Sequence, residues 1–317
     1  DGRIKALWIM ATNPVDSMPE ADVVKAALGA CPFVVVSDVT RHTDTTPYAH
    51  ALLPSLAWGE KDGTVTNSER RISRQRAFLA PPGETRADWW QMAEVGKRMG
   101  FSGAFSFTSA ADIFAEYARL SAAENGGSRD FDIGRFADIT RRDYDAMLPV
   151  QWPQPTGSDS NATRFFADGR YYTPDRRARF IATPSRALAS PTTAQYPFVL
   201  NTGRIRDQWH TMTRTGLVPR LFGHRAEPYV EIHPQDAQRL AITPASLVEI
   251  KADDNVSIVR ALITDAVKPG DIFQPMHWSA AFANAALVNC YTPSSVDPIS
   301  GQPALKSACV SVTQFTA

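Results

Sequence analysis

Cysteine is scarce in this sequence, with three among 317 residues, at positions 31, 290 and 309. No two of them have the Cys-x-x-Cys spacing of zinc and iron–sulfur sites, and three are too few for a disulfide framework. We therefore interpret all three as structural residues and predict no metal site within this chain. Few and scattered cysteines also favour a reducing compartment, so we expect a cytoplasmic protein.

Long apolar runs and an excess of one charge are also absent. No apolar run reaches the roughly 18 residues of a membrane-spanning helix, and the first residues lack the layout of a signal peptide. The 33 basic and 33 acidic side chains cancel, which argues against a broad basic surface for nucleic acid. We expect neither a nucleic-acid partner nor a membrane partner.

Lysine is rare, because the 33 basic residues consist of 7 lysines and 26 arginines. Arginine carries a planar, always charged guanidinium that suits phosphate and carboxylate groups. A bias in codon usage explains the same excess equally well. The composition alone leaves both explanations open.

The common catalytic signatures are missing. The sequence contains no GxSxG, HExxH, P-loop or GxGxxG motif, so the nucleophile, zinc and phosphate sites that these motifs build are not indicated. The six histidines are dispersed, and His42 and His50 lack the spacing and the carboxylate partner of a ligand set. We predict no catalytic residue in this chain.

The pattern that is present indicates two domains, because a typical domain holds roughly 100–200 residues. Residues 1–127 predict a Rossmann-like α/β domain with a parallel sheet, since short apolar and β-branched runs are typical of buried parallel strands. The strands are expected at residues 6–10 and 33–36, with a further apolar stretch at 51–53. Helices are expected at 19–30, 86–99 and 110–122, and a polar turn at 60–64.

The rest of the chain has a different character. Residues 128–193 are rich in Pro, Asp, Arg and aromatic side chains, and they predict an extended, irregular linker with short helices and a hairpin around Tyr171 and Tyr172. Residues 194–317 predict a mostly-β barrel, because several short strands surround one small helix. The expected strands are 198–200, 229–232, 247–251, 257–264 and 306–312, and the helix is 233–240.

Polar side chains follow the first two predicted strands. Asn13 comes after the first strand, and Ser37 and Asp38 come after the second. In doubly wound sheets, ligands bind beyond the carboxyl ends of the strands, where a carboxylate can accept from a base or ribose and a hydroxyl can donate to phosphate. An ordinary turn or helix cap explains the Ser-Asp pair at least as well.

A second polar string follows the predicted strand at 198–200. Thr202-Gly203-Arg204 is continued by Trp209-His210-Thr211. Glycine lets the backbone approach a ligand closely, arginine offers a bidentate fork to an anion, and tryptophan can pack on a flat heterocycle. A strand end with a surface arginine is an equally good local explanation.

Taken together, these strings resemble a known family, the molybdopterin oxidoreductases of the dimethyl-sulfoxide-reductase superfamily. The resemblance rests on Asn13-Pro14, Val36-Ser37-Asp38, the block from Glu60 to Arg71, the string from Thr202 to Thr211, His277-Trp278, Asn289, Asp297-Pro298 and Lys306. The middle segments Arg129 to Ile133, Pro149 to Pro153 and Phe166 to Arg170 resemble assimilatory nitrate reductases. The resemblance extends over essentially the whole chain.

The resemblance implies that the C-terminal barrel, of double-psi-like type, binds a molybdopterin guanine dinucleotide. The implied cofactor is molybdenum bis(molybdopterin guanine dinucleotide), and the substrate is nitrate, reduced to nitrite. The implied cofactor-binding residues are Asn13, Ser37, Asp38, Lys61, Asp88, Thr202, Gly203, Arg204, Trp209, His210, Thr211, Met276, Asn289 and Lys306. Met276 stands where the family usually has Phe, and Arg70 and Arg71 either face the substrate funnel or form surface ion pairs.

The sequence departs from the family in one important respect. The family carries a cysteine-ligated four-iron, four-sulfur cluster and its molybdenum ligand in N-terminal parts that have no counterpart here. We therefore expect a C-terminal portion of a catalytic subunit, inactive alone, whose partners are the missing N-terminal domains and an electron donor (ferredoxin, flavodoxin or an NADH-dependent reductase subunit). The alternatives are another enzyme on the same scaffold, such as a formate dehydrogenase or a periplasmic nitrate reductase, a non-catalytic scaffold of the same fold, or a free-standing nucleotide-binding module.

Overall fold

The chain forms two compact units in a computed structural model that describes residues 2–157, 164–184, 187 and 190–316. One unit combines residues 1–53 with 185–317, and the other comprises residues 54–184. The first unit is therefore discontinuous in sequence. The domain boundaries at 127 and 193 that the sequence suggests stay a prediction.

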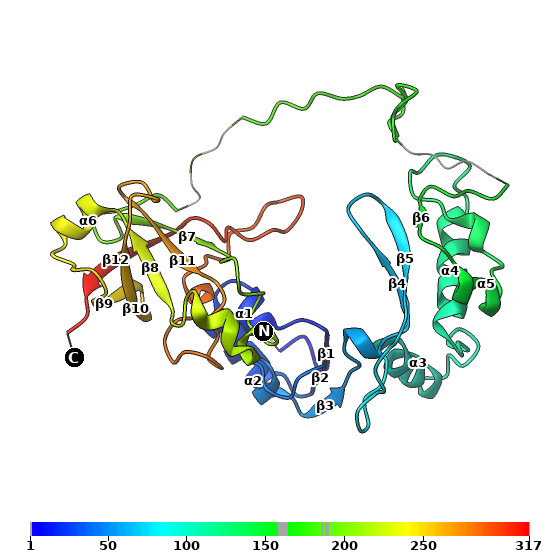
Figure 1. Cartoon of the computed structure of the whole chain (residues 1–317), viewed down its shortest axis with the longest axis horizontal. Helices are drawn as coiled ribbons and strands as arrows, with labels where there is room; N and C mark the ends of the chain where they lie inside the picture. Colours follow the sequence, from blue (N-terminus) through cyan, green and yellow to red (C-terminus); the bar gives the residue numbers. More distant parts are fainter. Residues whose placement is uncertain (1, 158–163, 185–186, 188–189, 317) are drawn as a thin grey trace. The chain divides into compact units, whose positions relative to one another are not determined.

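The N-terminal segment of the first unit forms a small parallel sheet with helices. Its strands follow the order β1 (Leu7–Met10), β2 (Val34–Asp38), β3 (Ala51–Pro54), and β1 pairs in parallel with β2 (Figure 1). The helices are α1 (Pro14–Ser17), α2 (Ala21–Ala30) and the 3-10 turn η1 (Thr46–Tyr48). The apolar side chains of Ile9, Val34 and Val36 pack with Leu28 of α2, which explains why these strands are continuous apolar runs.

The C-terminal segment of the first unit is a closed six-stranded barrel in the order β10-β8-β11-β7-β12-β9. Its strands are β7 (Phe198–Gly203), β8 (Tyr229–Ile232), β9 (Leu247–Ala252), β10 (Asn255–Ile263), β11 (Asp271–Pro275) and β12 (Ala308–Gln314). Its short helices are α6 (Pro234–Arg239), η4 (Thr215–Leu217), η5 (Pro219–Gly223) and η6 (Val288–Cys290). The pairs β10–β8 and β11–β7 are parallel, and the other pairs are antiparallel.

The barrel core comes from the inward-facing alternate residues of these strands. Leu200, Ile250 and Ile272 have no exposed surface, and Val310 is equally buried. At about 25 cal/mol per Å², each such side chain contributes roughly 1.5–3 kcal/mol on burial. The predicted fold class, an α/β parallel-sheet part followed by a β-barrel, is confirmed.

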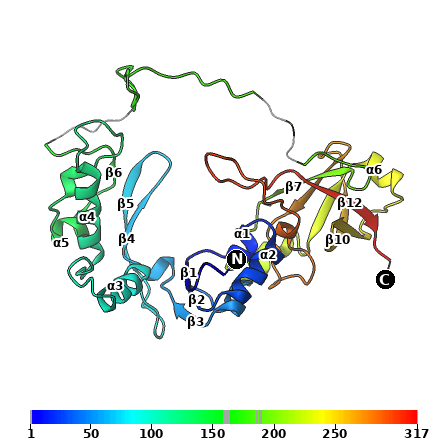
Figure 2. The ribbon, with the colours of Figure 1, turned by 180° about the vertical axis from the view of Figure 1, so that it is seen from behind.

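The second unit contains a small antiparallel sheet and three helices. The sheet has the order β4 (Gly63–Thr66), β5 (Arg71–Gln75), β6 (Val150–Gln151). The helices are α3 (Asp88–Arg98), α4 (Ala110–Ala122), α5 (Arg141–Ala146) and the 3-10 turns η2 (Trp58–Glu60) and η3 (Gly134–Phe136). Figure 2 shows α4 and α5 side by side, and Phe114 of α4 packs against Tyr144 of α5 with ring centroids 5.4 Å apart.

Two local predictions are corrected here. The polar turn expected at 60–64 is wrong, because β4 begins at Gly63 and the reversal lies at 67–70. There the Asn67 side-chain oxygen accepts from the backbone N–H groups of Glu69 and Arg71, the bond pattern of an Asx turn. The hairpin expected around Tyr171 and Tyr172 is also wrong, since that stretch has turns and no strand.

Residues 128–193, expected to be a linker with short helices, contain α5 and β6 in their first part. The strand β6 completes the sheet of the second unit by pairing Val150 with Ile72. Both elements are short, and β6 follows a proline, so neither produces a periodic pattern in the sequence.

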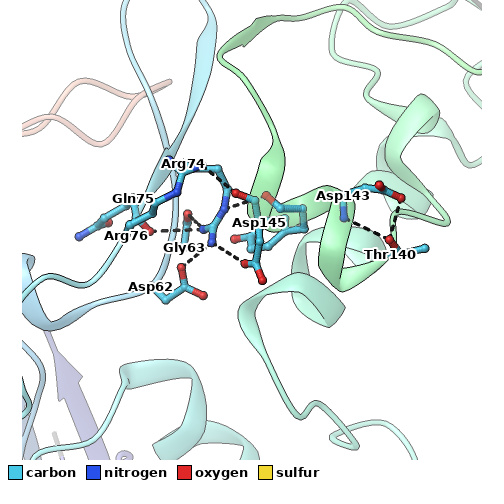
Figure 3. A network of polar contacts seen from close by, with 9 residues as sticks. Asp62, Gly63, Arg74, Gln75, Arg76, Thr140, Asp143 and Asp145 are labelled. Carbon is cyan, nitrogen blue, oxygen red and sulfur yellow. Dashed lines mark hydrogen bonds and ion pairs between the residues drawn. The ribbon is translucent and has the colours of Figure 1, made fainter.

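Arg74 joins these elements through one buried guanidinium (Figure 3). Its Nε donates to the Tyr144 carbonyl oxygen at 2.9 Å, and its Nη1 donates to the Gly63 carbonyl oxygen at 2.5 Å. Its Nη2 lies 2.7 Å from a carboxylate oxygen of Asp62 and 3.1 Å from one of Asp145. The Arg74 side chain is 3% exposed, so one arginine satisfies partners from β4 and α5 at once. Among the described residues, no helix combines the length and the apolar character needed to cross a membrane.

Candidate functional site: a polar loop at the rim of the barrel

The candidate site begins where β7 leaves the barrel. Thr202 is buried, and its hydroxyl donates to the Leu305 carbonyl oxygen at 2.7 Å. The exposed Lys306 directs its ammonium to the Thr202 carbonyl oxygen. The two predicted residues Thr202 and Lys306 are therefore brought together, although 104 positions separate them in sequence.

Gly203 allows β7 and β11 to pass closely at this rim. A Cβ atom added at Gly203 would lie 2.8 Å from the Phe273 ring and 3.6 Å from Nζ of Lys306. The backbone N–H of the half-buried Met276 donates to the Gly203 carbonyl oxygen at 2.9 Å. A side chain at position 203 would crowd this approach, since Cβ contacts below 3.0 Å require a neighbour to shift.

The loop that follows presents a cation and an aromatic ring to solvent. The Arg204 guanidinium lies over the Trp209 ring, 5.2 Å from its centroid, and Trp209 is 61% exposed. Arg204 forms no ion pair within the described residues, so its charge is available to an anion. His210 packs edge-to-face on Trp209 at 4.7 Å and has a positive φ of 45°.

Thr211 completes the predicted set on this loop. Its hydroxyl exchanges a hydrogen bond with that of Thr213 at 3.1 Å. The backbone N–H of Trp209 donates to the Thr215 hydroxyl at 3.2 Å. Positive φ at His210 and at Met212 (57°) places two non-glycine residues in a costly conformation, which the surrounding bonds must hold.

His277 holds this loop from the barrel side, and sequence reasoning did not predict it as a site residue. The ring is fully buried. Its Nε2 accepts the Ile205 backbone N–H at 2.9 Å, and its Nδ1 lies 2.7 Å from the His210 carbonyl oxygen. Burial, with Arg204 and His210 nearby, lowers the pKa of His277. The sequence signal was the pair His277-Trp278 in the family resemblance, which by itself names no hydrogen-bond partner.

The second predicted cluster lies at the carboxyl ends of β1 and β2. Asn13 precedes α1, and its side-chain oxygen accepts from the Thr45 hydroxyl at 2.5 Å. Ser37 is fully buried and accepts from the Trp8 indole N–H at 2.8 Å. The half-exposed Asp38 accepts from the Thr40 backbone N–H at 3.1 Å. Asn13 and Asp38 are partly exposed, and the cofactor roles of all three residues stay a prediction.

Asn289 connects the barrel to α1 within the same unit. Its side-chain amide donates to the backbone oxygens of Asp16 and Met18, the latter at 3.1 Å. Both amide hydrogens are thereby used inside the chain, which leaves the carbonyl oxygen of Asn289 for a ligand. The predicted pterin contact of Asn289 stays a prediction.

An acidic pair lies beside this connection. Burial raises the pKa of Asp16, and the neighbouring Asp44 raises it further. Asp44 accepts from the Ala280 backbone N–H at 2.7 Å. Two carboxyl groups in such proximity favour a shared proton. The contact between Asp16 and Asp44 can therefore join the N-terminal segment to the barrel loop with only one of the two carboxyl groups ionised.

Lys61 and Asp88 form a pair of their own in the second unit. The Lys61 ammonium lies 2.7 Å from one Asp88 carboxylate oxygen. The other oxygen, Oδ1, is buried and has no hydrogen-bond partner among the described residues. The two residues are thus brought together, and their predicted role in holding a nucleotide stays a prediction.

Arg70, Arg71 and the cysteines have structural surroundings. The Arg70 guanidinium lies 3.8 Å from the Phe165 ring centroid, and its Nε donates to the Trp152 carbonyl oxygen at 3.1 Å. Arg71 lies 3.7 Å from the Glu69 carboxylate. The three cysteines are free, and burial raises the pKa of Cys290 to about 12.

Two cavities lie outside the rim loop. One of about 460 Å³ belongs to the first unit and is lined by Lys25, His42, Thr43, Asp44, Thr46, Pro47, Tyr48, Ala280 and Ala281. One of about 420 Å³ belongs to the second unit, where arginines and aromatic residues between Arg164 and Arg176 line it. Neither cavity is lined by a predicted cofactor-binding residue. Within the described ranges, no three His, Cys, Asp or Glu side chains converge as a metal site.

Comparison with known families agrees with this architecture. The family described as "Molybdopterin oxidoreductase" matches residues 1–98, and the "Molydopterin dinucleotide binding domain" matches residues 198–309. The second match spans the barrel and its rim loop. The chain belongs to the molybdopterin oxidoreductases.

The similar proteins include several nitrate reductases. The chain is 48% identical over 99% of its length to a nitrate reductase of Klebsiella oxytoca, and it covers 36% of that protein. It is 31% identical over 98% of its length to the assimilatory nitrate reductase catalytic subunit of Bacillus subtilis, covering 42% of it. An F420-dependent formate dehydrogenase subunit alpha of Methanocaldococcus jannaschii is 31% identical over 98% of the chain. The chain thus spans less than half the length of these relatives.

The fold also has a solved counterpart. Acetylene hydratase from Pelobacter acetylenicus matches with a TM-score of 0.72 at 16% identity, covering 98% of this chain and 44% of that protein. At this identity the likeness concerns the fold alone.

The rim residues fit the group that the family name implies. A dinucleotide offers phosphates and flat rings, and the rim offers Arg204 without a carboxylate partner, the exposed Lys306 and the exposed Trp209 ring. Arginine forks and ammonium groups bind phosphate, and an indole face can stack on a base. The donor set therefore suits a dinucleotide anion at this position.

Proposed function

We propose that this chain is the C-terminal cofactor-binding portion of a molybdenum bis(molybdopterin guanine dinucleotide) nitrate reductase. In the complete enzyme it would serve the reduction of nitrate to nitrite for assimilation. The observation that carries the proposal is the rim loop, with Arg204 free of carboxylates and stacked on Trp209 in the dinucleotide-binding barrel. The nitrate reductase relatives support the choice of substrate.

The bound cofactor would supply the redox chemistry and the oxygen-atom transfer, while the protein supplies orientation and charge. Arg204 would donate to phosphate oxygens, and Lys306 would add a second cation from β12's side of the rim. Trp209 would cover the apolar face of a ring. Thr202 and Gly203 would set the distance of the backbone from the ligand.

The chain itself would bind and orient without carrying out the reaction. We expect the four-iron, four-sulfur cluster and the molybdenum ligand in N-terminal parts of the complete polypeptide. Electrons would come from ferredoxin, flavodoxin or an NADH-dependent reductase subunit, in the cytoplasm. The chain alone should not oxidise reduced viologen with nitrate.

A formate dehydrogenase is the second candidate. The formate dehydrogenase subunits of Methanocaldococcus jannaschii and Methanococcus maripaludis are 28–31% identical to this chain, against 48% for the Klebsiella oxytoca protein. The higher identity favours nitrate. A scaffold without cofactor is disfavoured because the cations and the aromatic residue of the rim are all present.

The test uses the complete polypeptide and the substitution Arg204→Gln, with Arg206→Gln as the matched control. Arg206 lies two positions further on the same loop and is already paired with Asp207 at 3.0 Å. Loss of a charged hydrogen bond costs about 1.5–3 kcal/mol, so cofactor retention should fall roughly 10-fold or more in the first variant alone.

Three measurements decide the outcome: pterin and guanine content, nitrate-dependent oxidation of reduced viologen, and formate-dependent reduction of viologen. Nitrate activity with wild-type pterin content supports the proposal. Formate activity without nitrate activity would favour the second candidate. Equal pterin content in both variants would contradict the role of Arg204. Nitrate reduction by the 317-residue chain alone would contradict the proposal that this chain needs further domains for activity.

A further inference from the structure

The parallel ladder between β7 and β11 continues past its last paired residues through a side chain. The last strand pair is Gly203 with Pro275, and the Met276 N–H still donates to the Gly203 carbonyl oxygen. Beyond this point the next acceptor for β7 is the imidazole of His277, whose Nε2 accepts the Ile205 N–H at 2.9 Å. The ring thus takes the place that a backbone carbonyl would occupy in a longer strand.

The same ring also reaches the far end of the loop. Because Nε2 accepts a hydrogen bond, the single proton of the neutral ring lies on Nδ1. Nδ1 then donates to the His210 carbonyl oxygen at 2.7 Å. One imidazole therefore fixes both ends of the segment 205–210, and it does so only in its neutral form and in this tautomer.

We propose that His277 is the positioning residue of the rim loop, holding segment 205–210 in the shape that presents Arg204 and Trp209, and that a proton on His277 opens it. The inference rests on the proposed function for the identity of the ligand, but the hold on the loop is independent of it. The two non-glycine residues at positive φ, His210 and Met212, need such an external constraint.

The charges around the ring determine when it opens. Arg204 and His210 act on His277 from the loop, whereas Asp207 of the same segment is engaged with Arg206 and His224. Burial and these neighbours hold the pKa of His277 below its usual 6.5. The imidazole is therefore neutral at neutral pH. In acid, the protonated Nε2 has no lone pair for Ile205, and the bond is lost.

Two substitutions separate the two bonds. In His277→Gln the amide oxygen can reach the position of Nε2, keeping an acceptor for Ile205. In His277→Asn the amide nitrogen lies near the position of Nδ1, keeping a donor for His210. Neither side chain titrates. His233→Asn is the matched control, since His233 of the same barrel accepts from the Gln235 N–H at 3.2 Å before α6, and Asn serves there equally well.

The first measurement is hydrogen exchange of the Ile205 amide in the complete polypeptide isolated without cofactor, in steps from neutral pH into acid, corrected for intrinsic rates. One hydrogen bond is worth about 1 kcal/mol, so we expect exchange about fivefold faster in His277→Asn at every pH. Because the pKa of His277 lies below its usual 6.5, the wild type should become similarly faster only in the acid part of the series, and His277→Gln should show no such pH dependence. The barrel amides of 247–263 report that each variant is folded.

The second measurement is the pterin content of the complete polypeptide after gel filtration across the same pH series. Wild-type protein should lose pterin over the pH range in which its Ile205 exchange accelerates, and His277→Gln should retain it there. Unchanged Ile205 exchange in His277→Asn, or a pH dependence that persists in His277→Gln, would overturn the proposal. Faster exchange with unchanged pterin would overturn the link to the cofactor. Absence of pterin in every protein, with the exchange pattern as expected, would reject the proposed function. The role of His277 in holding segment 205–210 would still be supported.

Discussion

Replacing Arg74 with methionine should destabilise the second unit, because this buried guanidinium connects β4, β5 and α5. Methionine keeps the unbranched stem and removes all donors. The Gly63, Gln75 and Tyr144 carbonyl oxygens would then lose their side-chain partner. The guanidinium also lies 3.8 Å from the Tyr144 ring centroid, and this contact would be lost as well.

The magnitude follows from the exposure of each partner. Three carbonyl bonds at about 0.5–1.5 kcal/mol each give roughly 2–4 kcal/mol. Asp62 and Asp145 are 48% and 58% exposed, so water can solvate them again, and their ion pairs add little. The expected loss is therefore about 2–4 kcal/mol, below the roughly 3–5 kcal/mol for breaking a fully buried pair.

The assay is hydrogen exchange of residues 134–151 under native conditions, with the barrel residues 247–263 as internal reference. A loss of about 2–4 kcal/mol in the second unit corresponds to exchange roughly 30- to 1,000-fold faster, since each 1.4 kcal/mol is a factor of ten. Arg142→Met on the exposed face of α5 is the control. Protection in Arg74→Met equal to that in Arg142→Met would refute the reasoning.

Three further predictions concern the first unit. Asp16→Asn should flatten the pH dependence of the free energy of unfolding measured in urea. Burial and Asp44 raise the pKa of Asp16 above its usual 3.8. The wild type should therefore lose up to about 1.4 kcal/mol of stability per pH unit as the pH rises above 4. Cys290, with a pKa of about 12, should react with iodoacetamide at pH 8 at least about tenfold more slowly in native than in urea-unfolded protein, as mass spectrometry would show. Gly216→Ala should lower the free energy of unfolding by about 1–3 kcal/mol, because its Cβ would lie 2.4 Å from the Phe282 ring. The loss would be measured as a lower urea midpoint, and an unchanged midpoint would contradict this packing.

The fold was largely predictable where burial leaves a direct mark on the sequence. The run around Val34 is apolar because its strand is largely covered, whereas the strand around Val248 alternates buried apolar and more exposed charged residues, and both were recognised as strands. The strand β11 was not recognised, since Asp271–Pro275 is short and contains proline. Proline is acceptable there because it lies at the end of the strand, where the ladder passes to Met276 and His277.

The exposed residues of the candidate site were named from the sequence, and the residues that support them were not. Arg204 and Trp209 have side chains that suit a dinucleotide, but an ordinary strand end explains them equally well, and Lys306 was named only through the family resemblance. His277 makes its two bonds to residues 72 and 67 positions away. The sequence does not distinguish a histidine that faces solvent from one that completes a strand ladder. The hydrogen-bonding role of His277 is therefore visible only in the folded barrel.

Two supports of the rim loop come from distant parts of the chain. Thr202 bonds to Leu305 across 103 positions, and Ile205 bonds to His277 across 72. Contacts at such separations form only after the intervening loops close. Loop closure costs conformational entropy before the hydrogen bonds can offset that cost. The loop therefore acquires its shape as a late consequence of pairing β7 with β11 and β12. A peptide of residues 198–215 contains the exposed ligand residues of the loop without their partners, and for that reason it should bind a dinucleotide far more weakly than the closed barrel.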